Sequence, residues 1–222
     1  LVPWEESIRV PTLICHPDLK KQQKCESIIS NIDLVPTILE FSGLDKDTIN
    51  TNYPELKGTS FANMVENVDH KNNRDNEGHL IHGVQIIPTV FNVAEKFRHI
   101  GLADSLIDKF KAFATKGNFL PDFSPPLNYK GVVDKRYKFI RYFSPRENNI
   151  PNTFAELSNN NASFQLYDLL NDPYEMHDIS KTENNKGLLM SMNDKLNKLT
   201  DKEIGLENHI LHLPGPDWFW TT

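Results

Sequence analysis

Two groups of basic side chains are the strongest candidates for contact with a substrate. His79 and His82 lie in a polar stretch, and an imidazole suits an anionic group. Arg136, Lys138 and Arg141 alternate along an expected strand, so one face of that strand could recognise an anionic group. For both groups a solvated surface without a role is the simpler interpretation, and both interpretations stay open.

The cysteines and acidic residues do not predict a metal site. Cys15 and Cys25 are the only cysteines, and they lack the CxxC spacing of a zinc site even though His16 follows Cys15. The acidic residues are dispersed, so we expect no specific metal ion to bind this chain. The two thiols could form one disulfide in a secreted protein or stay reduced in the cytoplasm, and composition does not decide between these states.

Length, composition and net charge exclude several classes of protein. At 222 residues and 25.5 kDa the chain can bury a real core, in one large domain or two small ones. A net charge of −6 without a run of basic residues argues against nucleic-acid binding. No apolar run approaches the roughly 20 residues of a membrane span, and no signal peptide opens the chain. Because residue 1 is Leu rather than Met, we expect the natural N-terminus and any targeting segment to lie upstream.

A helix with clear signals at both ends precedes the polar stretch. Asp33 is a good N-cap, Pro36 falls in the first turn where its missing N–H costs nothing, and Gly43 supplies a stop. The aliphatic residues between these signals make one apolar face. We therefore expect Ile38 and Leu39 to lie in the core.

The remaining patterns predict an α/β beginning and an antiparallel end. The apolar, β-branched residues 7–15 suit a buried strand, and the polar residues 45–80 indicate a surface loop with one short helix. Further along we expect a helix at 91–116, a hairpin at 131–143 with its turn at Asp134-Lys135, a strand at 164–169, and a helix at 184–199. These patterns divide the chain into the end of an α/β domain (1–62), a polar loop and long-helix insertion (63–127), and an antiparallel sheet with a covering helix (128–222).

Four segments of the chain carry motifs in a recognisable order. They are Trp4-Glu5-Glu6-Ser7-Ile8-Arg9-Val10-Pro11, Asp33-Leu34-Val35-Pro36-Thr37-Ile38-Leu39 with Gly43, Leu56-Lys57-Gly58-Thr59-Ser60-Phe61, and Tyr137-Lys138-Phe139-Ile140 followed by Leu166-Tyr167-Asp168-Leu169-Leu170-Asn171-Asp172-Pro173-Tyr174-Glu175. In this order they resemble the second half of the type I sulfatases of the alkaline-phosphatase-like superfamily. Each motif alone is common, but the four together indicate this family.

The resemblance implies catalytic chemistry that this sequence does not contain. Type I sulfatases attack sulfate monoesters with a formylglycine made from the Cys or Ser of a Cys/Ser-x-Pro-x-Arg motif, and a calcium ion neutralises the sulfate. Cys15 is followed by His-Pro-Asp and Cys25 by Glu-Ser-Ile, so neither fits that motif. A site lysine commonly precedes the family's aromatic-Glu-Glu segment, which places it just upstream of Leu1. We therefore expect no catalytic residue here, and Ca²⁺ and formylglycine in an N-terminal half of the same protein.

The resemblance also implies a place for the beginning of the chain. The first motif segment would lie at the entrance of the site because it follows the missing lysine, and its candidate residues are Trp4, Glu5, Glu6 and Arg9. An ion pair that fixes this segment onto the sheet is the simpler interpretation of its charges. The implied partners are the N-terminal half and a sulfate-ester substrate, and the implied location is periplasmic, secreted or lysosomal.

The sequence thus predicts an α/β fold, in which the end of an alkaline-phosphatase-like sulfatase domain precedes a small antiparallel C-terminal subdomain. The predicted function is that of a C-terminal sulfatase fragment, inactive alone, whose parent is a sulfuric ester hydrolase. Two alternatives stay open: a phosphonate or phosphodiester hydrolase of the same superfamily, and a non-catalytic interaction or oligomerisation module. Because the strand at 7–15 would lack neighbours in the isolated chain, we expect oligomers, aggregation or local unfolding over about residues 1–45.

Overall fold

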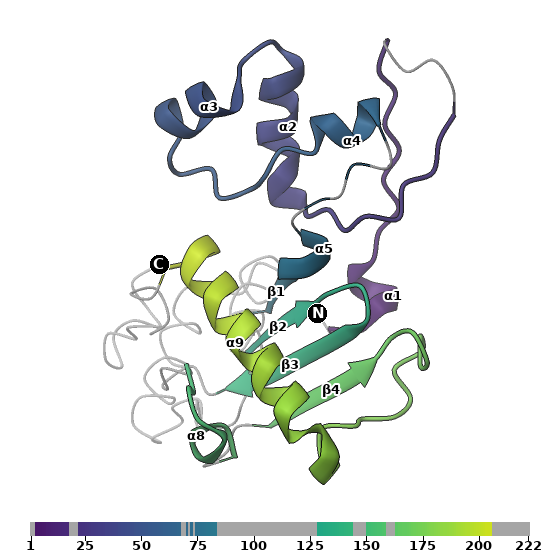
Figure 1. Ribbon diagram of the computed structural model, residues 1–222, viewed down its shortest axis with the longest axis vertical. Helices are drawn as coiled ribbons and strands as arrows, with labels where there is room; N and C mark the ends of the chain where they lie inside the picture. Colours follow the sequence, from purple (N-terminus) through teal and green to yellow (C-terminus); the bar gives the residue numbers. More distant parts are fainter. Residues whose placement is uncertain are drawn as a thin grey trace, which may run out of the picture.

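The described residues form a helical unit and a sheet unit, with a short helix between them (Figure 1). This computed structural model describes residues 3–17, 22–67, 70, 72, 74–83, 128–143, 150–158 and 163–205. The helical unit consists of a 3-10 turn (Asn31–Asp33) and the helices α2 (Leu34–Phe41), α3 (Lys46–Asn52) and α4 (Ala62–Glu66). The sheet unit consists of α1 (Glu5–Ile8), β1 (His79–Gly83), β2 (Asn128–Val133), β3 (Tyr137–Phe143), α8 (Phe154–Ser158), β4 (Phe164–Asp168), a 3-10 turn (Glu183–Asn185) and α9 (Lys186–Glu203). The helix between the units is α5 (Arg74–Glu77).

The sheet is antiparallel throughout, with the strand order β1-β2-β3-β4. Its central hairpin is the one that the sequence predicts, and it turns at Asp134. The Asp134 carboxylate accepts hydrogen bonds from the backbone N–H groups of Arg136 (2.9 Å) and Tyr137 (2.7 Å), which closes a tight turn. The predicted combination of helices with a small antiparallel sheet is confirmed.

Helix α9 covers one face of the sheet (Figure 1). Its apolar residues recur every three or four positions and therefore form one stripe along the helix, made of Leu189, Met192, Leu196 and Leu199. The stripe packs on three fully buried side chains from neighbouring strands, Val132, Phe139 and Leu166. The main core of the described part thus lies between α9 and the sheet.

Helix α1 packs on the opposite face of the sheet. Ile8 contacts a second buried cluster, whose members are Ile81, Tyr129, Ile140 and Tyr167. The Trp4 ring meets the Tyr167 ring edge-on, with 6.1 Å between the ring centroids. Acidic residues in the first turn of α1 suit the positive end of a helix dipole.

The predicted strand at residues 7–15 is wrong. Residues 5–8 form α1, and residues 9–15 run without regular secondary structure. Leu13 is 98% exposed and Val10 is 63% exposed, so the apolar pattern faces solvent. A strand needs a neighbour to pair its N–H and C=O groups, and no strand of the described part pairs with this segment.

Helix α2 begins and ends close to its predicted bounds, but its apolar face is not covered. Gly43 has a φ of 97°, the left-handed conformation expected of a helix stop. Ile38 is 63% exposed and Leu39 is only partly buried, so the prediction that both lie in the core is wrong. The buried residues of α2 are Pro36 and Thr37. Amphipathic spacing shows that residues share a face, but not what lies against that face.

The edge strand β1 was not predicted. Its residues fall in the stretch for which the sequence predicts a polar surface loop and an insertion. β1 pairs with β2 from His79 opposite Val133 to Gly83 opposite Tyr129. The sheet therefore takes one strand from outside residues 128–222. The helix predicted at 91–116 lies outside the described residues.

Candidate functional site

The fully buried carboxylate of Asp33 connects several segments of the chain. One oxygen accepts hydrogen bonds from the Thr59 N–H (2.7 Å) and from Arg74 Nη2 (2.7 Å). The other accepts from the Ser30 N–H (2.8 Å) and from Arg74 Nε (2.5 Å). Arg74 also donates through Nη1 to Glu203 at the end of α9 (2.9 Å). We call Asp33, Arg74 and Glu203 the joint cluster, because it ties the helical unit to the sheet unit.

This arrangement keeps the Arg74 guanidinium protonated. Burial by itself would lower the pKa of the guanidinium, but the hydrogen bonds and charges of Asp33 and Glu203 raise that pKa overall. Burial also raises the pKa of Glu203, against the lowering effect of Arg74. The joint cluster is therefore a buried ion network whose members depend on one another.

Two further motif residues complete the surroundings of Asp33. Thr37 Oγ1 donates to the backbone oxygen of Asp33 (2.6 Å) and accepts from the backbone N–H of Phe61 (3.1 Å). Gly58 lies directly against the backbone of Ile32, where a Cβ atom would stand 1.9 Å from the carbonyl oxygen. The threonine and the glycine of these motifs are thus explained by hydrogen bonding and by close approach of two backbone segments.

Gly58→Ala is expected to lower the free energy of unfolding by about 1–3 kcal/mol, because the added methyl group overlaps a backbone atom and forces the two segments apart. Urea denaturation measures the change. Gly187→Ala is the matched control, since a Cβ there meets nothing within 4 Å and alanine favours a helix by about 0.5–1 kcal/mol. Equal effects of the two substitutions would contradict the close approach at Gly58.

Glu5 and Lys138, two of the predicted site residues, meet in a buried ion cluster. Lys138 Nζ lies 3.2 Å from Glu5 Oε1 and 2.6 Å from Glu175 Oε1, and the Lys138 side chain has no exposed surface. The Glu5 N–H donates to the other oxygen of Glu175 (2.9 Å). Glu175 holds this position at a φ of 55°, which side-chain-bearing residues rarely adopt. These contacts fix the beginning of the chain onto the sheet.

The other residues of the first segment and of the hairpin turn lie nearer to solvent. Trp4 is 37% exposed at the edge of the sheet, and Glu6 and Arg9 are exposed. Arg136 is half exposed and forms an ion pair with Asp168, the last residue of β4 (2.9 Å). None of these four candidates joins the Lys138 cluster through a contact within the described ranges.

The two candidate histidines are separated by the sheet itself. His79 and His82 are three positions apart on β1, so their side chains point to opposite faces. His79 shares a row with Lys138, with Val133 of β2 between them. Burial lowers the pKa of His82, and the charge of Lys130 lowers it further. In the described part, the eight predicted residues therefore do not form one site.

The structure adds a basic row in which Lys130, which sequence reasoning missed, joins two of the candidates named above. His82 is opposite Lys130, which is opposite Arg141, so all three side chains lie on the face of the sheet that α9 covers; Lys130 and Arg141 are buried, whereas His82 on the edge strand is exposed. Arg141 donates to the side-chain oxygens of Asn193 (2.6 Å) and Asn197 (3.0 Å) of that helix. Burial, followed by repulsion from Arg141, lowers the pKa of Lys130 to about 8. Because Lys130 and Arg141 have additional partners, we assign this row to the packing beneath α9.

The described residues also bear on metal binding and on membrane insertion. Within the described ranges, no group of three or more His, Cys, Asp or Glu side chains could hold a metal ion. Cys15 and Cys25 are both exposed. No helix in that part of the chain has the length and hydropathy to cross a membrane.

Comparison with known proteins bears on the stretch that contains Asp33, Gly58 and Arg74. Residues 2–94 match the family model for the C-terminal part of N-sulphoglucosamine sulphohydrolase. The match is to a sulfatase. The predicted resemblance to this family is therefore confirmed, and the matched stretch contains three of the four motif segments. A search of the curated proteins finds no match.

The matched stretch does not stand alone in the fold. It contains α1, the helical unit, α5 and β1, whereas β2, β3, β4 and α9 follow it. Glu203 and Lys138 come from this second part and bind Arg74 and Glu5 of the first. The sulfatase-like stretch and the remaining strands are therefore joined by buried ion pairs as well as by the sheet.

Proposed function

We propose that this chain is the C-terminal part of a sulfatase, a sulfuric ester hydrolase whose catalytic residues lie in an N-terminal half. The match of residues 2–94 to a sulfatase C-terminal region carries the proposal. The structure supports it through the motif residues, because Asp33, Thr37 and Gly58 hold the matched segments together by hydrogen bonds and close packing. The role of the chain is then to complete and stabilise a catalytic unit.

Uncovered apolar side chains on α2 and on the segment that follows α1 favour a partner of this kind. Six of them, which we name together the apolar face, are Val10, Leu13, Ile14, Leu34, Val35 and Ile38. The His16 ring stacks on the Phe41 ring with 4.6 Å between centroids, so the segment that carries the first three lies against the end of α2. Burying one such side chain contributes about 1.5–3 kcal/mol, so covering several would bind a partner firmly.

The occupant of the apolar face would be the α/β sheet of the N-terminal half. Helix α2 would cover that sheet, because parallel sheets are packed on both faces. Oligomerisation or aggregation of the isolated chain follows from the same exposed surface and stays a prediction.

Calcium and formylglycine belong to the same proposal. The described residues do not fit a calcium site, and neither cysteine lies in the formylglycine motif. Both groups would therefore be supplied by the N-terminal half. The residues of this chain would fix the entrance segment, through Lys138 and Glu175, and would add no catalytic group.

An aryl sulfate assay with added Ca²⁺ tests this division of roles. We expect no turnover by the chain alone, because the residues that would attack and neutralise the sulfate are not in it. Co-expression with the upstream half is expected to give turnover. Activity of the chain alone that is abolished by a substitution within residues 1–222 would contradict the proposal.

The upstream reading frame decides between the enzyme and a second candidate. A Cys/Ser-x-Pro-x-Arg motif in the same frame would support the sulfatase. Its absence would favour a non-catalytic interaction module, for which the apolar face is the specific observation.

A further inference from the structure

The joint between the two units depends on one guanidinium. Arg74 lies on α5, between the helical unit and the sheet unit in Figure 1, and its side chain is buried. It binds Asp33 of the helical unit and Glu203 of α9 at the same time. A charge placed beside Arg74 therefore affects the ion pairs that this residue makes with both units.

His79 directly follows the helix that carries Arg74, since the Gly78 N–H donates to the Arg74 carbonyl oxygen (2.8 Å) and β1 starts at the next residue. It begins β1, close enough to Arg74 and Asp33 to feel both charges. Its Nδ1 atom is buried and has no hydrogen-bond partner among the described residues, so the imidazole is held by packing. The acidic groups at the joint, Asp33 and Glu203, are already bound to Arg74.

We propose that His79 makes the joint acid-sensitive: when its imidazole takes up a proton, a second positive charge beside Arg74 loosens the helical unit from the sheet unit. Protonation also places a charged ring where its Nδ1–H finds no acceptor in the described structure, which is costly in a buried position. The proton is accommodated when the joint opens and water reaches the ring. This inference does not depend on the sulfatase proposal.

The direction of the pH effect follows from the state of the folded protein. Burial, and then the charge of Arg74, lowers the pKa of His79 from 6.5 to about 4. The opened state therefore binds more protons than the closed state between these values. The closed joint is fully stable above about pH 6.5 and loses stability as the pH falls toward 4.

Two neighbouring groups oppose or limit this effect. Burial raises the pKa of Glu203, so its protonation favours the closed state as the pH falls. Asp75 makes a second bridge, since it accepts the Ile28 N–H (3.0 Å) and pairs with Lys135 of the hairpin turn (3.0 Å). We therefore expect partial loosening of the helical unit, with the sheet retained.

Hydrogen exchange on the whole chain tests the proposal. After correction for intrinsic rates, we expect protection of α2 amides in the wild type to fall at least about tenfold between about pH 7 and pH 4.5, while β2 and β3 stay protected. His79→Asn is expected to remove this fall, and His82→Asn on the other face of β1 is expected to keep it. An equal fall in the wild type and His79→Asn, or no fall in the wild type, would overturn the proposal.

An NMR titration of the wild-type protein tests the proposal even if a variant fails to fold. The His79 ring protons, followed by NMR, are expected to titrate below about pH 5, because partial burial and the charge of Arg74 both lower the pKa of the imidazole. A His79 that titrates near its ordinary value of about 6.5 would overturn the proposal whatever the variants do.

Discussion

Arg74→Met is expected to lower the free energy of unfolding by about 3–5 kcal/mol, because it breaks a buried ion network by removing its cation. The substitution removes three hydrogen bonds to carboxylates and leaves Asp33 and Glu203 as buried charges without their cation. Asp33 keeps two backbone donors, those of Ser30 and Thr59, but these do not neutralise it. Urea denaturation followed by circular dichroism measures the loss.

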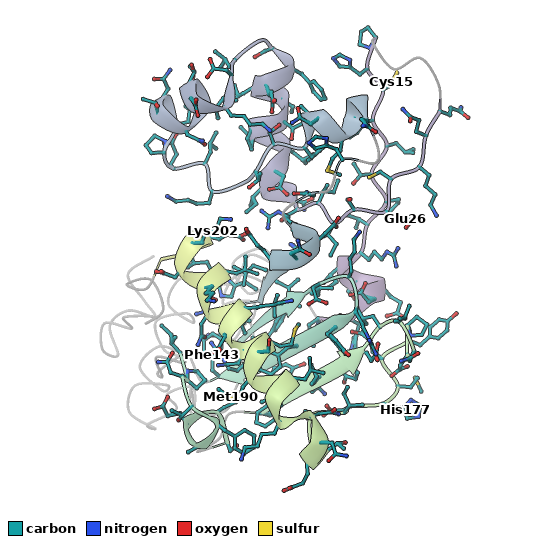
Figure 2. The ribbon with its side chains drawn as sticks, viewed as in Figure 1. Cys15, Glu26, Phe143, His177, Met190 and Lys202 are labelled. Carbon is teal, nitrogen blue, oxygen red and sulfur yellow. The ribbon has the colours of Figure 1, made fainter. Side chains whose placement is uncertain are left out.

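Lys202→Met is the matched control for Arg74→Met. Lys202 lies near the end of α9 that faces the helical unit (Figure 2) and pairs with Glu77 at 2.8 Å, but both side chains are about half exposed. Water screens such a pair, so we expect a change of about 0–1 kcal/mol. Similar losses for both variants would mean that the joint cluster is not shielded from water.

Leu196→Ala is expected to cost about 2–5 kcal/mol, because it leaves a cavity at the centre of the core between α9 and the sheet. The Leu196 side chain has no exposed surface and packs among Val132, Phe139 and Leu166. The cost combines the lost transfer free energy of the side chain with the cavity that rigid neighbours cannot fill. Denaturation of the purified variant gives the value.

Ile38→Ala is the control for Leu196→Ala, since it removes a similar aliphatic side chain from the exposed apolar face. We expect a change within about 0.5 kcal/mol in the isolated chain, as for most exposed positions. A large loss at Ile38 would show that the face is covered in solution, by a second copy for example. Repeating both measurements with the N-terminal half present would then identify the partner.

Features that depend on a few adjacent residues were predictable from the sequence. The hairpin at Asp134 and the stop at Gly43 each follow from one side chain or from one backbone conformation. The stripe on α9 follows from its spacing, and the sheet opposite it supplies the expected core. The family resemblance was also predictable, because it depends on the order of motifs and not on contacts.

Features that depend on distant partners were not predictable. β1 joins the sheet only because β2 lies beside it, and the polar ends of β1 hide its alternation. The burial of Lys138 depends on Glu5 and Glu175, which are far from it in the sequence. Lys130 could be placed beside Arg141 only once the strand register was known. For the same reason, the apolar pattern of residues 7–15 was not enough to form a strand.

The pairing of β1 with β2 has a consequence for how the chain tolerates changes in length. Gly83 and Tyr129 are cross-strand partners, so β1 ends and β2 begins at neighbouring positions of the sheet. In general, antiparallel strands paired in this way can be joined by a turn as short as two residues or by a longer connection. The entropy of closing a loop rises only slowly with its length, by about 0.6 kcal/mol for each doubling. By this measure the pairing of β1 with β2 tolerates connections of very different length, since a longer connection adds little to the cost of bringing the two strands together.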